Sequence, residues 1–263
     1  MHKRIIIPIT ILCFCLVMAG FLAYRYLERD DSTREYLPVF GNRSVNEAEI
    51  PEGPNQSPVP TATTTLDVLP KSILNSAPFV PQAPFANWDE LHEEACEEAA
   101  VATAHFYRIG KKELSADEAE RELLGLIHYE EEHFGAAKDI NADEMVRLAT
   151  GYYQDSTSSY RIEDKYSLTD LKRYLALGNV IIVPAAGRVL DNPNFKQPGP
   201  LYHALVLIGY DDNKQQFITN DPGTRKGAGF RYSYDNLLDS IHDFPGDKEK
   251  ILEGKKTVII VSK

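Results

Sequence analysis

Cysteine is scarce in this sequence, and its placement excludes a disulfide framework. The 263 residues include three cysteines, of which Cys96 alone lies outside the hydrophobic N-terminal stretch. Cys13 and Cys15 lie inside that stretch, and they do not end the Leu-small-small-Cys sequence that is typical of lipoproteins. Cys96 therefore has no partner for an intrachain disulfide in the soluble part, although a domain of ordinary size can build its core without one.

Positive charge is scarce as well. The chain has 28 Lys and Arg against 39 Asp and Glu, which gives it a net charge of −11 at neutral pH. It contains no basic stretch interleaved with aromatic residues, which a nucleic-acid-binding surface would require. We therefore expect no nucleic acid among the partners of this protein.

One long hydrophobic run is present, and it lies at the N-terminus. Residues 5–24 carry no charge, and twenty such residues are enough to cross a bilayer as a helix. Lys3 and Arg4 precede the run, which favours a cytoplasmic N-terminus. We predict that residues 1–27 are a signal anchor and that the protein is a single-pass cell-membrane protein with its C-terminal domain outside. The alternative is a cleaved signal peptide and a secreted protein.

The rest of the chain divides into a tether and one domain. Residues 28–77 are rich in proline, serine and threonine, and such a composition buries too little apolar surface to fold. We expect this segment to be an extended, disordered tether. Residues 78–263 have the length of one domain.

The pattern of the domain predicts helices first and strands second. Capping residues and apolar spacing predict helices that begin near Ala95, Ser115, Asn141 and Ser167. Short apolar or alternating runs then predict strands at 180–183, 203–210, 216–220, 230–234 and 256–262, with a short helix at 235–242. This order is typical of an α+β fold with a mostly antiparallel sheet.

Cys96 is a candidate nucleophile because of its position. It stands where a polar run turns into the first helical pattern, and the dipole and free N–H groups of a helix start favour a thiolate. The alternative is that Cys96 is a small buried apolar residue, which is the commoner fate of a free cysteine.

His203 and Asp221 are candidates for the partners of this thiol. His203 opens a predicted strand, and Asp221 follows the predicted return strand, so a hairpin would bring the two together. The carboxylate could then fix the tautomer of the imidazole and support an imidazolium beside a thiolate. The alternatives are a satisfied core histidine and an Asn-Asp-Pro-Gly sequence that serves only as a turn.

Gln82 lies upstream of the cysteine in a proline-fixed loop, Pro78-Phe-Val-Pro-Gln-Ala-Pro-Phe85. Acyl transfer requires donors directed at the developing oxyanion. The Gln82 amide and the backbone N–H of Cys96 could supply two of them.

Residues 78–263 resemble the C39-like papain-fold proteins of bacteria, the double-glycine-type peptidase superfamily. The resemblance rests on four segments in the order of that family: 79–88, 95–99, 199–210 and 218–224. It implies a papain-like cysteine-peptidase fold, with helices packed on the sheet and with cysteine, histidine and a third residue in that chain order.

The same resemblance implies roles for individual residues. Cys96 would be the nucleophile, His203 the general base, Asp221 the residue that orients it, and Gln82 the oxyanion donor. Asn220 is the alternative for the third position, because related thiol enzymes use asparagine there. The expected partner is a peptide or protein substrate, and no cofactor or metal is expected.

Two features complicate this interpretation. Glu97 and Glu98 follow the cysteine where the family often has small residues, and their charges disfavour a nearby thiolate. One of them could bind a cationic group of the substrate, or both could be solvated helix-cap acids. Trp88 could form an aromatic wall of the cleft, although it could equally pack the loop before the helix.

Three functions are compatible with these residues. The first is a membrane-tethered, outward-facing thiol hydrolase acting on peptide or amide bonds. The second is a transferase with the same chemistry, and the third is an inactive papain-fold module that binds cell-wall peptide or a protein partner.

The segment from His128 to His133 resembles a metal cluster, but its histidines are five residues apart and do not share a helix face, so we predict a solvated acidic segment instead.

Overall fold

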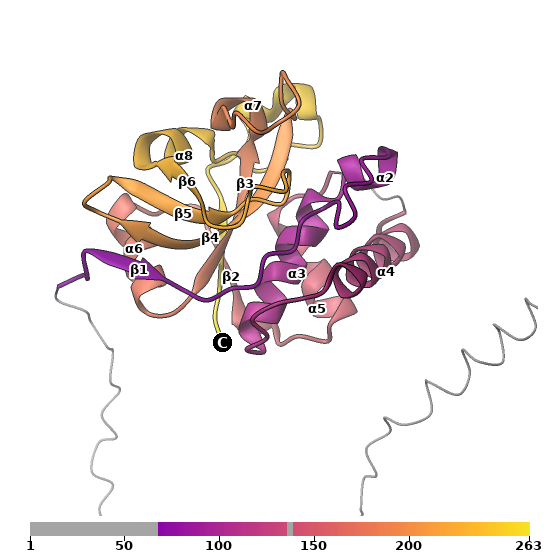
Figure 1. Cartoon of the computed structure of the whole chain (residues 1–263), viewed down its shortest axis with the longest axis horizontal. Coiled ribbons are helices and arrows are strands. Elements are labelled where there is room, and N and C mark those ends of the chain that lie inside the picture. The colour runs from indigo at the N-terminus through magenta and orange to yellow at the C-terminus, as the bar shows by residue number, and fades with distance from the viewer. Residues whose placement is uncertain (1–67, 136–138) are drawn as a thin grey trace, which may run out of the picture. The chain divides into compact units, whose positions relative to one another are not determined.

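A computed structural model describes residues 68–135 and 139–263 of the chain. In these two stretches no helix is both long and apolar enough to cross a membrane. The predicted membrane span, with Cys13 and Cys15, and most of the predicted tether lie outside the described residues. The described part is an α+β fold with helices on both faces of an antiparallel sheet (Figure 1).

The predicted capping residues begin the main helices. Ser115, Asn141 and Ser167 each cap a helix in a capping box, in which the side chain accepts from the backbone N–H three residues on. These helices are α4 (Ala116–Phe134), α5 (Ala142–Tyr152) and α6 (Leu168–Ala176). The first predicted helix is α3 (Cys96–Arg108), whose N-cap Ala95 makes no side-chain capping bond. The four predicted helices are thus confirmed.

The sheet has seven strands within the described residues, and neighbouring strands are antiparallel. The strands are β1 (Ser72–Leu74), β2 (Tyr160–Glu163), β3 (Val180–Ala186), β4 (Tyr202–Asp211), β5 (Gln216–Asn220), β6 (Phe230–Ser233) and β7 (Val258–Val261). Their order is β2-β7-β3-β4-β5-β6, and β1 pairs with β4. The predicted hairpin between β4 and β5 is confirmed.

The sheet includes a short strand that precedes residue 78, the predicted start of the domain. Residues 72–74, which the composition assigned to the tether, form β1 and pair with the end of β4. The preceding Lys71 accepts a hydrogen bond from the backbone N–H of Asp212 at 2.8 Å, and Asn75 donates to Ile208 at 2.8 Å. Three residues are too few to give a strand signal in the sequence. The strand forms because it pairs with β4, and local preference does not indicate it.

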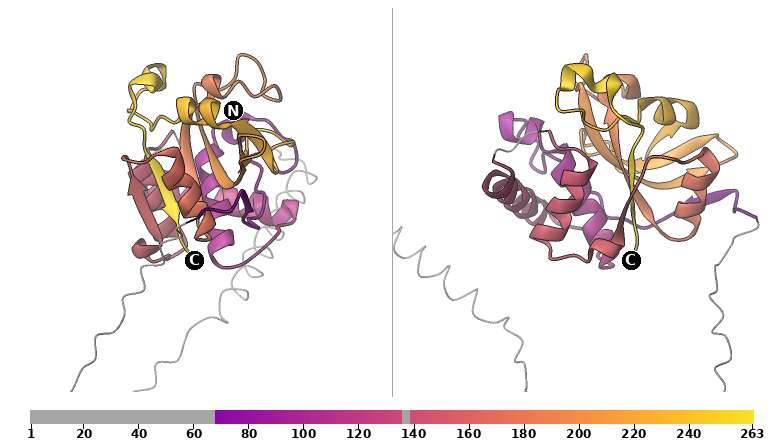
Figure 2. Two further views of the ribbon diagram at one scale, coloured as in Figure 1. Left: turned by 90° about the vertical axis from the view of Figure 1, so that its left-hand side faces the viewer. Right: turned by 180° about the vertical axis from the view of Figure 1, so that it is seen from behind.

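Both faces of the sheet are covered, so its central strands are apolar on both sides. Alternate residues of β3 divide between two cores: Val180 and Ile182 pack with α3, α4 and α5, whereas Ile181 and Val183 pack with α6. Helix α8 (Tyr234–Ser240) joins the second core. The view from behind in Figure 2 shows α3, α4 and α5, in purple to rose, beside the strands on one side.

Several short elements have no counterpart in the sequence prediction. They are α2 (Glu90–Glu93), η1 (Thr157–Ser159), α7 (Gly187–Leu190), η2 (Lys248–Glu253) and strand β2. Helix α2 lies directly before α3, and the loop after α7 leads into β4. These two segments bring side chains to the start of α3 and to the start of β4, where the predicted site residues lie.

Candidate active site

His203 lies near the start of β4 and faces Asp221 at the end of the neighbouring strand β5. The Nε2 atom of His203 is 2.9 Å from Oδ1 of Asp221. Both residues are buried, with 1% of His203 and none of Asp221 exposed. The ring of Phe195 packs edge-on against the imidazole, with 5.2 Å between the ring centroids. The hairpin therefore brings together the two residues that the sequence predicted to be partners.

Asp221 has donors on both carboxylate oxygens. Oδ1 also accepts the backbone N–H of Gly223 at 3.0 Å. Oδ2 accepts Nδ2 of Asn192 at 3.0 Å and the hydroxyl of Tyr232. Burial raises the pKa of Asp221, but the charge of His203 and the hydrogen bonds outweigh it, so the pKa lies below its ordinary value. Asp221 is thus an ionised, fixed acceptor for the imidazole.

Asn192 and Tyr232 were not predicted to belong to the site. Both side chains are buried, and Asn192 Nδ2 also lies 2.8 Å from the hydroxyl of Tyr232. They lie 29 and 11 residues from Asp221 in the sequence, on the loop after α7 and on β6. Contacts between segments far apart in the sequence bring them to the carboxylate, so no local sequence signal indicates them.

Cys96 is the first residue of α3, as the sequence predicted, and its side chain is 5% exposed. Its Sγ donates a hydrogen bond to Oε2 of Glu97 at 2.8 Å. The backbone N–H of Ala204, in the peptide that joins His203 to Ala204, lies near the sulfur and acts to lower the pKa of the thiol. The thiol therefore lies against the backbone of the candidate base, but its own proton is directed to Glu97.

The surroundings of Cys96 oppose its ionisation. Burial, followed by the charge of Glu97 and the hydrogen bond to it, raises the pKa of the thiol well above its ordinary value. The N–H of Ala204 acts in the opposite direction and does not compensate. In this arrangement the sulfur is a neutral thiol at physiological pH.

Glu97 and Glu98 are buried, which corrects the expectation that they could be solvated helix-cap acids. Glu97 is fully buried, and its Oε1 accepts the backbone N–H of Ile140 at 3.0 Å. Burial raises the pKa of Glu97 to about 8. Glu98 is 2% exposed, and burial followed by the charges of Glu97 and Glu130 raises its pKa well above the ordinary range.

The segment from His128 to His133 also differs from its prediction as a solvated acidic segment. Glu130 is fully buried on α4, where it hydrogen-bonds to Glu98. The two histidines do point outward: His128 pairs with Glu132 at 3.3 Å, and His133 stacks on Tyr129. In the part of the chain that the structure describes, no group of three or more His, Cys, Asp or Glu side chains could hold a metal ion.

Gln82 is buried beside the start of α3, with 4% of the residue exposed. Its Nε2 donates to the backbone oxygens of His92 at 2.8 Å and of Glu93 at 3.1 Å, both on α2. Its backbone N–H donates to Pro222 at 3.1 Å, directly after Asp221. The loop that carries Gln82 therefore joins the helical side of the site to the end of β5.

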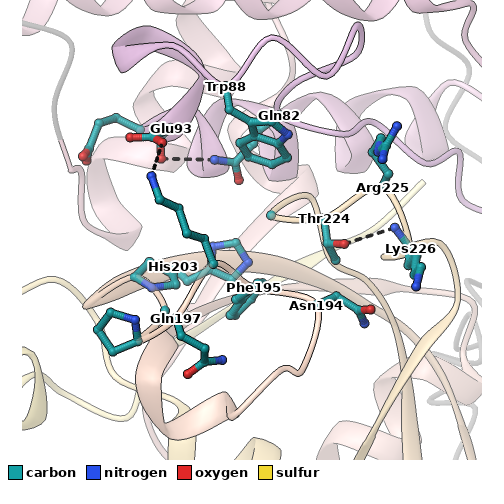
Figure 3. Close-up of a pocket in the computed structure, with 16 residues that line it drawn as sticks. Gln82, Trp88, Glu93, Asn194, Phe195, Gln197, His203, Thr224, Arg225 and Lys226 are labelled. Atoms are coloured by element: carbon teal, nitrogen blue, oxygen red, sulfur yellow. Dashed lines mark hydrogen bonds and ion pairs between the residues drawn. The ribbon is translucent and has the colours of Figure 1, made fainter.

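A pocket of about 820 Å³ opens between these two sides. Figure 3 shows Gln82, Trp88 and Glu93 along one wall, with His203, Phe195 and Thr224 across from them. Trp88 is 40% exposed and forms part of this wall. Lys196 and Glu93, which both line the pocket, form an ion pair with 3.5 Å between Nζ and Oε1. Cys96 and Glu97 do not line the pocket.

Asn220, the alternative third residue, is directed elsewhere. Its Nδ2 donates to the backbone oxygen of Pro78 at 2.8 Å, and its Oδ1 accepts from Gly229 at 3.2 Å. It thus holds the loop that leads to Gln82, whereas Asp221 occupies the hydrogen-bonding position on His203. The arrangement can orient an imidazole and can bring a thiol to the same strand end.

Residues 75–244, more than half of the chain, match the Peptidase_C39 like family. Two solved structures are similar: a protein from Bacillus anthracis described as a C39-like peptidase, and xylellain, a cysteine protease from Xylella fastidiosa. The first is 15% identical, with a TM-score of 0.46, and the match covers 73% of this chain and 98% of the other. The second is 15% identical, with a TM-score of 0.44, over 84% of this chain and 99% of the other. No curated protein matches.

Proposed function

Because the chain belongs to the peptidase C39-like family, we propose that it is a cysteine peptidase whose triad is Cys96, His203 and Asp221. The observation that carries this proposal is the buried His203–Asp221 pair, 2.9 Å apart, at the wall of the pocket. Nε2 of the imidazole faces the carboxylate, so Nδ1 is the nitrogen left for the thiol and the substrate. The thiol lies against the peptide that joins His203 to Ala204.

The reaction is acyl transfer to sulfur and then to water. His203 takes the proton of Cys96, Sγ attacks the carbonyl carbon of a peptide bond, and the imidazolium gives that proton to the leaving amine. Water then attacks the thioester with His203 as base, which releases the carboxylic acid and restores the thiol. Asp221 stabilises the imidazolium in both steps.

The backbone N–H of Cys96 and the amide of Gln82 are the proposed donors to the oxyanion. As the first residue of α3, Cys96 has an N–H with no acceptor inside the helix. Gln82 lines the pocket, but its amide donates to α2. Binding of a substrate would therefore have to draw this amide away from the backbone of His92 and Glu93.

We further propose that the peptidase is tethered to the membrane and faces outward. The support is the uncharged run 5–24 and the basic residues before it. The substrate would then be a peptide or protein outside the cell.

The hydrogen bond between Cys96 and Glu97 favours a second candidate, a non-catalytic module that binds peptides in the same pocket. A buried thiol that donates to a carboxylate is not a nucleophile in that state. The two candidates differ in whether bound peptide is cleaved.

The test is to incubate the full-length protein with a peptide mixture and to identify new amino termini by mass spectrometry. Wild type should cleave, Cys96→Ala should not, and His203→Ala should lose activity on the order of 10³-fold or more. His105→Ala is a matched control. Like His203, His105 is buried and faces a carboxylate, with 2.9 Å between its Nδ1 and Asp155, but it lies near the C-terminal end of α3, far along the helix from Cys96. Binding without cleavage by wild type would establish the second candidate, and cleavage by Cys96→Ala would exclude the proposed triad.

A further inference from the structure

Both carboxylate oxygens of Glu97 accept hydrogen bonds, and one of these bonds comes from Cys96. Oε2 of Glu97 accepts the thiol at 2.8 Å, and Oε1 accepts the N–H of Ile140 at 3.0 Å. The carbonyl of Ile140 in turn accepts the hydroxyl of Tyr202 at 2.8 Å. Tyr202 directly precedes His203 on β4, so the acceptor of the thiol proton is fixed to the strand that carries the candidate base.

The titratable groups around Glu97 are mainly acidic. Four titratable groups interact with Glu97 through charge or a hydrogen bond. They belong to α3, to the loop before α5 and to β4: Cys96, Glu98, Asp139 and Tyr202. Lys248 is one step removed, because its Nζ lies 3.6 Å from Asp139 and 3.3 Å from Glu94. The pair is therefore surrounded mainly by acidic groups, whose ionisation disfavours a negative charge on the sulfur.

We propose that Glu97 is a positioning residue that holds the Cys96 thiol protonated and out of the pocket in the resting protein. This inference rests on the proposed function, because keeping the Cys96 thiol protonated serves catalysis only if Cys96 later acts as the nucleophile. Catalysis then requires that the hydrogen bond to Glu97 break and that the side chain of Cys96 turn toward His203. The Gln82 amide, which donates to α2 in the same state, must likewise be redirected.

Glu97→Gln should reverse the effect of this residue on the thiol. The amide has nearly the same shape as the carboxyl group, and the N–H of Ile140 requires an oxygen opposite it. The amide nitrogen of the variant must then face Sγ. An uncharged N–H donor beside sulfur stabilises the thiolate, whereas Oε2 of Glu97 accepts the thiol proton and, where Glu97 is ionised, its charge opposes the thiolate.

The experiment measures alkylation of Cys96 by iodoacetamide, a small neutral probe, in the full-length protein between pH 6 and 10 without peptide. The Cys96 peptide is quantified by mass spectrometry, so that Cys13 and Cys15 do not contribute. Wild type should show a midpoint above the ordinary thiol value of about 8.5. Glu97→Gln should lower the midpoint by about one pH unit or more and speed alkylation near pH 7.5 about tenfold or more.

Glu98→Gln is the matched control. It removes the neighbouring buried carboxyl, which acts on the thiol through charge but receives no hydrogen bond from it. Its effect on the rate should therefore be smaller than that of Glu97→Gln. Equal effects of the two variants, or an unchanged or slower rate for Glu97→Gln, would overturn the inference.

A midpoint below 8.5 in wild type would also overturn the inference, and that measurement does not depend on whether a variant folds. The outcomes separate this inference from the proposed function because alkylation requires no turnover. Faster alkylation of Glu97→Gln in a protein that cleaves no peptide would support the positioning role of Glu97 and contradict the peptidase proposal. Cleavage that depends on Cys96, together with an alkylation rate that Glu97→Gln leaves unchanged, would support the peptidase proposal and contradict the positioning role of Glu97.

Discussion

The Nε2 atom of His203 lies 2.9 Å from Oδ1 of Asp221, and the second oxygen of that carboxylate accepts Asn192 and Tyr232. A buried carboxylate with this many donors keeps its charge and its orientation. The imidazole is consequently held in one tautomer, with Nδ1 directed away from Asp221. This fixed imidazole, together with the buried acids of α3, determines how the protein should respond to mutation and to pH.

Replacing Asp221 with asparagine should lower kcat by about 10²- to 10⁴-fold, because the amide no longer stabilises an imidazolium and can favour the wrong tautomer. KM for a cleaved peptide should change little, since Asp221 is fully buried and does not line the pocket. Steady-state kinetics on a single fluorogenic peptide measures both. If Asn220→Asp lowered kcat more than Asp221→Asn, the assignment of the third residue would pass to Asn220.

Tyr232→Phe should lower the free energy of unfolding by about 1.5–3 kcal/mol, because it removes a hydrogen bond to a buried charge. Its effect on kcat should be smaller than that of Asp221→Asn, because Asn192 and Gly223 still donate to the carboxylate. The matched control is Tyr234→Phe, whose hydroxyl donates to the partly exposed Asp212 at 2.7 Å. Equal losses of stability in the two variants would show that Tyr232 has no special relation to Asp221.

Gly223→Ala should impair catalysis more than folding. A Cβ on Gly223 would lie 2.9 Å from Cε1 of His203 and 2.9 Å from Cε1 of Phe195, so the imidazole must shift. The backbone of Gly223 does not require a positive φ, so the contact is the main cost. A displaced imidazole should lower kcat by about 10²-fold. Thermal unfolding measured beside kinetics separates the two effects, and full activity would contradict the close packing of His203.

The buried acids of α3 should make the protein less stable as the pH rises. Burial raises the pKa of Glu97 from its ordinary 4.5 to about 8, and burial also raises the pKa of Glu98. The folded state therefore binds more protons than the unfolded state between these values, so stability falls from about pH 4.5 to about pH 8. Asp221, whose pKa is lowered, contributes in the opposite direction, and its stabilisation is lost as pH falls below its ordinary value of 3.8.

Urea unfolding of the full-length protein at pH 5, 6, 7 and 8 measures this slope. Glu98→Gln should flatten it, because the amide cannot ionise. Glu118→Gln is the control, since Glu118 is an exposed acid of the α4 capping box and its pKa is lowered to about 2. An identical slope in wild type and Glu98→Gln would contradict the burial of this carboxyl group.

Much of the fold follows from local signals in the sequence. Ser115 and Asn141 begin their helices because their side chains accept the N–H three residues on, which is a contact within four residues of chain. The apolar run of β3 identifies a strand covered on both faces. The proximity of His203 and Asp221 was also predictable, because the hairpin returns the end of β5 to the first half of β4, where Asn220 pairs with Val206.

The parts that the sequence did not reveal depend on distant contacts. A carboxylate after a helix start is ordinarily solvated, whereas Glu97 is buried and accepts the backbone N–H of Ile140, 43 residues on. Asn192 likewise reaches Asp221 from 29 residues away. Short elements such as β1 have no pattern of their own, since three residues are too few to show a period.

Strand β1 also determines where the folding unit begins. The last residues of β4 extend past the start of β3, and β1 pairs with them there, at Gly209 to Asp211. Gly209 is suited to this contact, because a Cβ there would lie 2.2 Å from the carbonyl oxygen of Ile73. A protein trimmed to the family match at residue 75 would expose the backbone N–H and C=O groups of this strand end to solvent. Such an open edge is a site for strand addition by a second molecule, so the minimal soluble fragment should begin before Pro70, whose carbonyl accepts the hydroxyl of Tyr210.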